Sequence, residues 1–252
     1  MKYIKEYEDF INEAKRTKLN GLELIAKLAK VSVDELINLK ELYLNNNKLV
    51  ELPKEIGNLT KLTSLNLSVN QLVELPKEIG NLTNLKELNL YTNQLKELPK
   101  EISNLNNLTN LYLGNNKLKE LPKEIENLKE LTELYLHNNQ LTELPKEISN
   151  LTNLTALNLH SNKLVELPKE IGNLNNLKEL DLSDNKLTSI LNELVKWRWF
   201  YKLDLENLSD KEWLKLFKAD KFRVIKHKDF PKGLRSNKDI EDIANADDFG
   251  LI

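Results

Sequence analysis

The side chains best suited to bind or react in this chain are a small set of tyrosines and histidines. The 252 residues contain seven tyrosines, three histidines and no cysteine. Four of the tyrosines and two of the histidines recur at spacings that are multiples of 23 residues: Tyr43, Tyr112 and Tyr135 in one series, and Tyr91, His137 and His160 in a second. Tyrosine offers a large contact area with few rotatable bonds and is enriched in binding surfaces. The pattern therefore indicates recognition of a partner.

Patterns typical of catalysis are missing from the sequence. It has no glycine-rich phosphate loop, no His-Glu-x-x-His and no Gly-x-Ser-x-Gly, and the lack of cysteine excludes a thiol nucleophile. Glutamates recur in one column, at 51, 74, 97, 120, 143 and 166, beside a lysine column that runs from 54 to 169. Regular columns of both signs are typical of a solvated face rather than an acid/base pair. We expect no enzymatic activity and no cofactor.

A metal site is the alternative use of the two histidines. His137 and His160 occupy equivalent positions 23 residues apart, with Asp181 and Asp184 one period further on. Imidazole and carboxylate can share a transition metal ion. Two solvated histidines without a fixed third ligand are usually not a metal site, so the sequence predicts none.

A strict repeat must position these side chains. The phrase Leu-x-x-Leu-x-Leu-x-x-Asn occurs seven times without a gap, and its asparagines stand at 47, 70, 93, 116, 139, 162 and 185. A fixed period of this length means that one unit, unable to bury its apolar face alone, stacks on copies of itself. The sequence therefore predicts a solenoid with one continuous core.

The physical role of each position can be read within a single repeat. In Leu65-Asn-Leu67, apolar and polar residues alternate, which predicts a short strand with leucines inside, and copies of it form a parallel sheet. Asn70 falls at the turn, where an amide side chain can pair backbone groups that an irregular connection leaves unsatisfied. Pro76 and the following Lys77-Glu78-Ile79 then return the chain through a short helical or extended segment.

These phrases resemble the leucine-rich repeat family, in its 23-residue subclass with Leu-Pro-x-x-Ile outer segments found in bacterial and Ras-suppressor-like members. The resemblance covers about residues 36–208. It implies an α/β fold: a curved horseshoe with a parallel sheet on the concave side and short helical or extended outer segments. It also implies a surface that binds another protein.

Both ends depart from the repeat, as terminal units that need caps should. We predict a helical N-terminal cap at 1–35, with a second short helix carrying Leu22, Ile25 and Leu28. Residues 36–208 hold seven full repeats and one degenerate repeat, in which leucines replace the proline and the asparagine. Residues 209–252 form a mixed C-terminal cap and tail.

The outward strand positions vary while the scaffold stays constant, and this variation locates the predicted binding surface. One outward column reads Tyr43, Asn66, Asn89, Tyr112, Tyr135, Asn158 and Asp181, and the next reads Asn45, Ser68, Tyr91, Gly114, His137, His160 and Ser183. The predicted partner-binding residues are Tyr43, Tyr91, Tyr112, Tyr135, His137, His160 and Asp181. Seven steps of about 4.8 Å, from the first strand to the eighth, make the surface roughly 35 Å long. The alternative is that tyrosine simply suits strands and that the variation is drift after duplication.

A protein partner fits this surface better than a metabolite does, because the surface is large. With a net charge of −2 and no apolar run of about 18 residues, we expect neither nucleic-acid binding nor a membrane span. The alternative function depends on the basic segment 211–238, which contains ten Lys or Arg against three acids. In this alternative, the segment targets RNA or an anionic surface while the solenoid serves as a rigid spacer.

Two further expectations concern the state of the protein. We expect a monomer, with dimerisation through an imperfectly capped edge as the alternative. Without cysteine or a secretory signal we expect a cytoplasmic protein, and a secreted effector that lacks a cleavable signal is left open.

Overall fold

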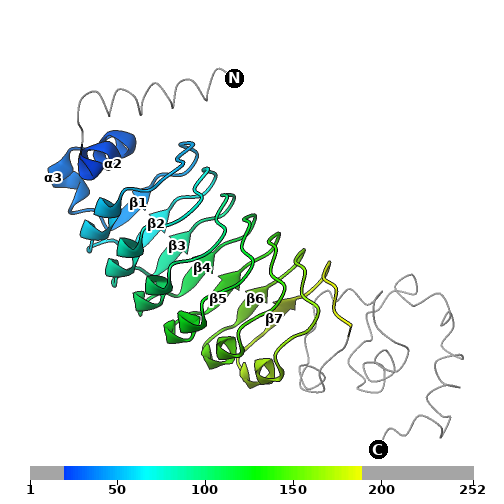
Figure 1. Cartoon of the computed structure of the whole chain (residues 1–252). Coiled ribbons are helices and arrows are strands. Elements are labelled where there is room, and N and C mark those ends of the chain that lie inside the picture. The colour runs from blue at the N-terminus through cyan, green and yellow to red at the C-terminus, as the bar shows by residue number, and fades with distance from the viewer. Residues whose placement is uncertain (1–19, 189–252) are drawn as a thin grey trace, which may run out of the picture.

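The computed structural model describes residues 20–188, which form one stack of repeats with an N-terminal helical unit (Figure 1). The first predicted helix, the degenerate eighth repeat and the C-terminal segment 209–252 lie outside the described residues. The domain limits given above therefore stay predictions.

One parallel sheet runs the length of the stack, as the alternation of leucines predicted. Seven three-residue strands are ordered β1 to β7, and each residue pairs with the residue 23 positions on, such as Leu111 with Leu134. The strands are β1 Glu41–Tyr43, β2 Ser64–Asn66, β3 Glu87–Asn89, β4 Asn110–Tyr112, β5 Glu133–Tyr135, β6 Ala156–Asn158 and β7 Glu179–Asp181. Side chains at equivalent positions of neighbouring repeats therefore lie side by side across the sheet.

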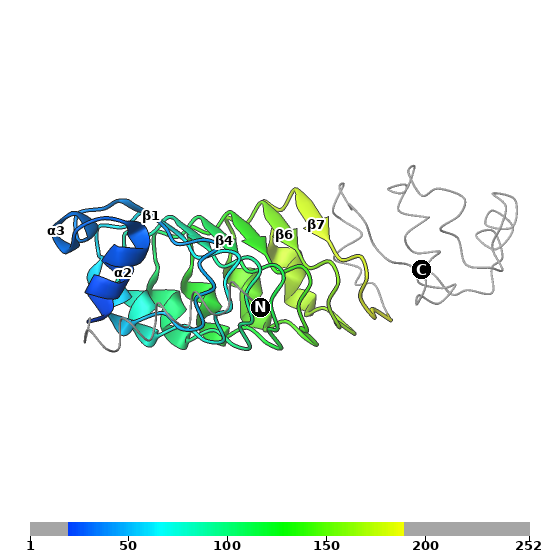
Figure 2. The ribbon, with the colours of Figure 1, turned by 90° about the horizontal axis from the view of Figure 1, so that it is seen from above.

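Short 3-10 helices return the chain on the side opposite the sheet (Figures 1 and 2). The sequence left open whether these segments are helical or extended, and the structure has 3-10 helices throughout the described repeats. They are η1 Lys54–Asn58, η2 Lys77–Asn81, η3 Lys100–Asn104, η4 Lys123–Asn127, η5 Lys146–Asn150 and η6 Lys169–Asn173. A proline precedes each one, and its fixed φ near −60° suits the entry to a tight turn. Each helix also buries its isoleucine in the core.

The core is a column of leucines shared by consecutive repeats. In the repeat around β4, Leu108, Leu111, Leu113 and Leu118 have no exposed surface. Each such side chain contributes roughly 1.5–3 kcal/mol on burial. Because these residues lie between the sheet and the 3-10 helices, the alternate strand positions are left to face solvent.

The N-terminal end is covered by two helices. Helix α2 (Gly21–Ala29) carries the three leucine and isoleucine positions predicted for a short helix and buries Ile25. Asn20 is its N-cap, and the Asn20 side chain accepts from the backbone N–H of Glu23. Helix α3 (Val33–Leu36) was not predicted, although its capping box of Ser32 and Glu35 was present in the sequence. The backbone N–H of Ser32 lowers the pKa of the Glu35 carboxyl.

The asparagine column joins the repeats through buried amides, as the sequence analysis proposed. Asn116 Oδ1 accepts from the N–H of Leu95 at 3.0 Å, and its Nδ2 donates to the carbonyls of Leu90 and Leu113, both at 3.0 Å. Five more asparagines form the same buried bonds: Asn70, Asn93, Asn139, Asn162 and Asn185. Each amide therefore connects its own repeat to the preceding one.

Replacing Asn116 with alanine should lower the free energy of unfolding by about 2–4 kcal/mol, because a buried donor and two buried acceptors lose their partners. The matched control is Asn107→Ala. Asn107 also donates across repeats, to Thr83 O at 2.8 Å, but it is exposed, so water can replace it and the loss should stay below about 1 kcal/mol. Urea unfolding of both variants gives the comparison. Equal losses would show that the buried column has no special role.

Candidate functional site

The sheet presents three columns of side chains to solvent, and the predicted binding surface includes only two of them. The column it missed starts each strand: Glu41, Ser64, Glu87, Asn110, Glu133, Ala156 and Glu179. We call these residues the first column, the series containing Tyr112 the middle column, and the series containing His137 the third column. Alternation of leucine with polar residues along each strand could have located the first column.

Four of the predicted site residues come together on β3 to β5 and the turns that follow these strands, and we call them the aromatic cluster. The ring centroids of Tyr112 and Tyr135 are 5.3 Å apart, those of Tyr91 and His137 are 5.6 Å apart, and those of Tyr135 and His137 are 6.5 Å apart. The first two pairs are tilted and the third meets edge to face, which are favourable geometries for aromatic rings. The three tyrosines and His137 thus form a continuous patch, with every member partly exposed.

Gly114 allows the contact between Tyr91 and His137, which stand two repeats apart. A Cβ atom on Gly114 would lie 2.4 Å from Cε1 and 2.6 Å from Nε2 of His137. The imidazole therefore lies over the glycine, in the space that a side chain would fill, and reaches Tyr91 on the far side. Sequence spacing could not show this contact, because it depends on the direction of the His137 side chain.

Glu133 of the first column completes the cluster. The Tyr112 hydroxyl donates to Glu133 Oε2 at 2.9 Å, and partial burial together with this carboxylate raises the pKa of Tyr112 to about 12. The Tyr91 hydroxyl accepts from Asn115 Nδ2 at 2.8 Å. Burial also raises the pKa of Tyr135, with the Glu133 and Glu179 charges adding to the effect. Hydrogen bonds therefore hold the hydroxyls of Tyr112 and Tyr91, and the phenol of Tyr135 is partly buried near two carboxylates.

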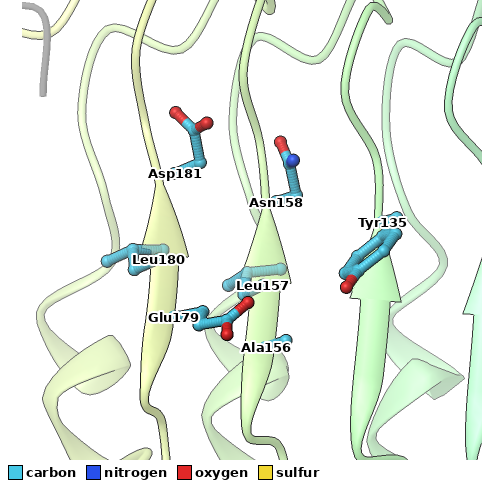
Figure 3. A pocket seen from close by; sticks show the side chains of 7 residues that line it. All are labelled: Tyr135, Ala156, Leu157, Asn158, Glu179, Leu180 and Asp181. Atoms are coloured by element: carbon cyan, nitrogen blue, oxygen red, sulfur yellow. The ribbon is translucent and has the colours of Figure 1, made fainter. Parts of the chain in front are cut away.

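Two hollows adjoin Tyr135. The first, of about 480 Å³, is lined by Glu133 and the aromatic cluster, together with Asn89. The second, of about 400 Å³, lies over β6 and β7, where Ala156 replaces a longer side chain (Figure 3). In Figure 3, Tyr135, Asn158 and Asp181 stand in a row on three neighbouring strands. The tyrosine ring therefore separates two sites that a single extended ligand could occupy.

The other predicted site residues do not join the cluster. Tyr43 on β1 is 59% exposed and donates to Glu41 Oε2 at 2.6 Å. Asp181 Oδ1 accepts from the N–H of Ser183 at 3.1 Å. Asn66, Asn89 and Asn158 accept in the same way from the N–H two residues on. At these positions the middle column supports its own turn.

His160 belongs to a local polar network instead. Its Nδ1 lies 2.9 Å from Ser183 Oγ and its Nε2 lies 3.0 Å from Ser161 Oγ, and these serine hydroxyls donate to Asp181 and Asp184 respectively. The two nitrogens that a metal would need are therefore engaged with serines. Among residues 20–188, no three His, Asp or Glu side chains are grouped so as to hold a metal ion.

The face is acidic around its aromatic centre. The three outward columns of the seven repeats contain five carboxylates, Glu41, Glu87, Glu133, Glu179 and Asp181, and no lysine or arginine. Burial is the main cause that lowers the pKa of His137, and the neighbouring His160 lowers it further, while Asp181 opposes the shift. The Nδ1 atom of His137 is buried without a hydrogen-bond partner among the described residues. The neutral imidazole is thus favoured at the centre of the patch.

Comparison with known proteins agrees with this architecture. A family model described as "Leucine-rich repeat region" matches residues 18–115 and 101–219. The chain belongs to the leucine-rich repeat family. No curated protein matches this leucine-rich repeat chain.

Solved structures of leucine-rich repeat proteins are similar to the chain. One is the ectodomain of the membrane receptor kinase GASSHO1/SCHENGEN3 from Arabidopsis thaliana in complex with CASPARIAN STRIP INTEGRITY FACTOR 2, with 33% identity and a TM-score of 0.64 over 70% of this chain and 23% of that one. Another is the plant peptide hormone receptor RGFR1 in complex with RGF2, with 30% identity and a TM-score of 0.53 over 71% and 39% of the two chains. A leucine-rich repeat protein of Leptospira interrogans is 36% identical over 72% and 65%, with a TM-score of 0.38.

This leucine-rich repeat chain thus spans less than two thirds of the length of each of these proteins. Within residues 20–188, no helix is both long and apolar enough to cross a membrane.

The change Gly114→Ala should displace His137 without unfolding the stack. The three atoms nearest to the new Cβ all belong to the imidazole, which can rotate away, so the expected change in unfolding free energy is within about 1 kcal/mol. The ring-current shift that Tyr91 imposes on the His137 Cε1–H should disappear from the NMR spectrum. Ser68→Ala, in the same column after β2, is the control and should leave that signal in place. An unmoved imidazole in Gly114→Ala would disprove the packing.

His137 should titrate below the ordinary histidine pKa of about 6.5, which NMR of its Cε1–H measures directly. Because the folded pKa is lowered, the unfolded chain binds more protons in this window. Stability is therefore complete above the unfolded pKa and falls as the pH drops through it towards the folded value. His137→Gln should remove that part of the pH dependence in urea unfolding between about pH 7.5 and 5. A midpoint above the ordinary value would contradict this.

Proposed function

We propose that this leucine-rich repeat protein is a non-catalytic interaction module that binds a protein partner through its sheet face, with the aromatic cluster at the centre of the contact. The observation that supports it best is the cluster itself. Tyr91, Tyr112, Tyr135 and His137 place aromatic surface beside a hollow on a solvent-facing sheet, although the leucines and asparagines of the fold do not require them there. Aromatic residues around a concavity are the usual anchors of protein interfaces.

The relatives lend support at the level of the fold. Two of the similar structures are receptors described in complex with another molecule, CASPARIAN STRIP INTEGRITY FACTOR 2 in one and RGF2 in the other. We carry over only the general use of a repeat surface for binding, because fold similarity does not transfer a particular partner. We also assign the chain to the 23-residue subclass, on its unbroken period and its Leu-Pro-x-x-Ile segments.

The chemistry of the cluster argues for binding rather than catalysis. Tyr112 has a pKa of about 12, so its phenol is protonated at neutral pH and is a poor base. His137 Nδ1 forms no hydrogen bond within residues 20–188, so that nitrogen activates no nucleophile there. These groups offer contact area and fixed hydrogen bonds.

Affinity capture from a native lysate should identify a partner that binds wild type and is lost when Tyr91, Tyr112, Tyr135 and His137 are all changed to alanine. The four side chains lie outside the leucine core, so the variant should fold, which circular dichroism and urea unfolding would verify. Losing a central group of anchors should weaken binding by at least about 100-fold.

The matched control changes four exposed lysines of the outer 3-10 helices, Lys77, Lys100, Lys123 and Lys146, to alanine. It removes the same number of side chains from the opposite side and should retain the partner. An unchanged capture profile for the cluster variant would refute the sheet-face proposal. Capture that is instead abolished by moderate salt would favour the basic segment 211–238 as the contact.

A further inference from the structure

We propose that the hollow between β3 and β5 receives an arginine side chain from an extended segment of the partner protein. The guanidinium would stack against the tyrosine rings and pair with Glu133, while its aliphatic stem covers the aromatic surface. This inference rests on the proposed function and specifies the chemistry that the sheet face recognises.

The walls of the hollow suit a flat cation. Tyr91, Tyr112 and Tyr135 line it together with His137, and the Tyr112 and Tyr135 centroids are only 5.3 Å apart. A cation within about 6 Å of a tyrosine ring is attracted to its negative face, and the attraction grows when water is partly excluded. The tyrosine hydroxyls also fix the ring positions, because Tyr112 donates to Glu133 and Tyr91 accepts from Asn115. The hollow is therefore pre-formed rather than assembled by a ligand.

Glu133 supplies the anion, and one of its two carboxylate oxygens is available to a ligand. Tyr112 occupies Oε2, whereas Oε1 accepts no hydrogen bond within residues 20–188. A half-buried carboxylate with a free oxygen beside aromatic rings is well matched to a guanidinium, which brings several donors in one plane.

The surrounding charge has the same sign. Glu87 acts electrostatically on Tyr112, and Glu179 acts on Tyr135, so carboxylates of the first column flank the hollow on both sides. The columns of the seven repeats contain no lysine or arginine to offset them, and the lowered pKa of His137 keeps the neighbouring imidazole neutral near pH 7. An anionic ligand is therefore disfavoured and a cationic one favoured.

Arginine fits better than lysine for two physical reasons. Its planar guanidinium stacks on aromatic rings and is less strongly hydrated than an ammonium, so it loses less on entering a half-buried site. Its fork of donors can serve the Glu133 carboxylate while the plane remains against a ring.

The hollow is open, and a second hollow lies beyond Tyr135 over β6 and β7. Together they suit neighbouring side chains of an extended segment rather than an isolated metabolite.

The test is NMR titration of the full-length protein with acetyl-Ala-Ala-Arg-Ala-Ala-amide, observing the His137 Cε1–H and the ring signals of Tyr112 and Tyr135. The comparison peptide replaces arginine with citrulline, which keeps the shape and removes the charge. We expect saturable shifts for the arginine peptide with a dissociation constant of about 1 mM or tighter, and affinity at least about tenfold weaker for the citrulline peptide.

Glu133→Gln should weaken arginine binding about tenfold and leave the fold intact. The matched control is Glu41→Gln, which neutralises another first-column glutamate that accepts from a tyrosine hydroxyl, here Tyr43 of the same strand β1, where no ring contact is formed. It should not change the affinity. Equal binding of both peptides, no saturable shift for either, or equal effects of the two substitutions would overturn the proposal.

The chain's own basic segment is the competing occupant, because residues 211–238 contain Arg223 and Arg235. If the cluster signals move on changing both to glutamine without any peptide, the hollow holds this segment and the inference of a partner's arginine is wrong. Failure of the peptide titration together with loss of a captured partner in the cluster variant would refute only the arginine. An unaffected capture would refute the proposed function as well.

Discussion

The buried amide of the repeated asparagine is the interaction on which the structure depends. A turn after each strand leaves backbone groups without a partner in the interior, and one asparagine satisfies a donor and two acceptors that belong to two different repeats. The bond requires Leu90, Leu95 and Leu113 to lie at fixed positions around Asn116. The unbroken 23-residue period and the parallel register of the sheet provide those positions in every described repeat interface.

The register of the sheet determines which side chains of the aromatic cluster meet. The leucine core takes no part in these contacts. Residues 23 apart become neighbours across a strand pair, so Tyr112 meets Tyr135. Residues 46 apart meet only where the repeat between them has no side chain at the equivalent position. Gly114 is such a gap, and it lets His137 reach Tyr91. Because the scaffold already satisfies its own backbone, side chains on the sheet face can change singly without altering the stack. This independence is what makes a repeat surface suited to specific recognition.

The sequence was sufficient for features fixed by periodicity and insufficient for those fixed by side-chain direction. The parallel sheet, the leucine core, the asparagine column and the outward position of Tyr112 follow from the repeat alone. The bond from Tyr112 to Glu133 and the overlap of His137 with Gly114 depend on rotamers, which spacing does not specify. The backbone conformation of the turn was also not predicted from the sequence. The turn position takes a positive φ in all seven described repeats, even where the residue is the β-branched Val69. There the fold imposes its geometry against local preference.

The hydrogen bonds of the middle column bear on whether its tyrosines arose by drift after duplication. Where it carries asparagine or aspartate, the side chain accepts from the N–H two residues on, as Asn89 does from Tyr91 at 3.0 Å. Tyrosine cannot form this bond, so Tyr112 and Tyr135 give up a local interaction worth about 1 kcal/mol in each repeat. In return, two rings on adjacent strands pack against each other in a tilted arrangement and border a hollow beside Glu133. Random replacement would scatter such losses, whereas two of the three, at Tyr112 and Tyr135, fall on neighbouring repeats beside a glycine that opens the same surface. The coincidence of these changes in one place favours a binding site over neutral variation.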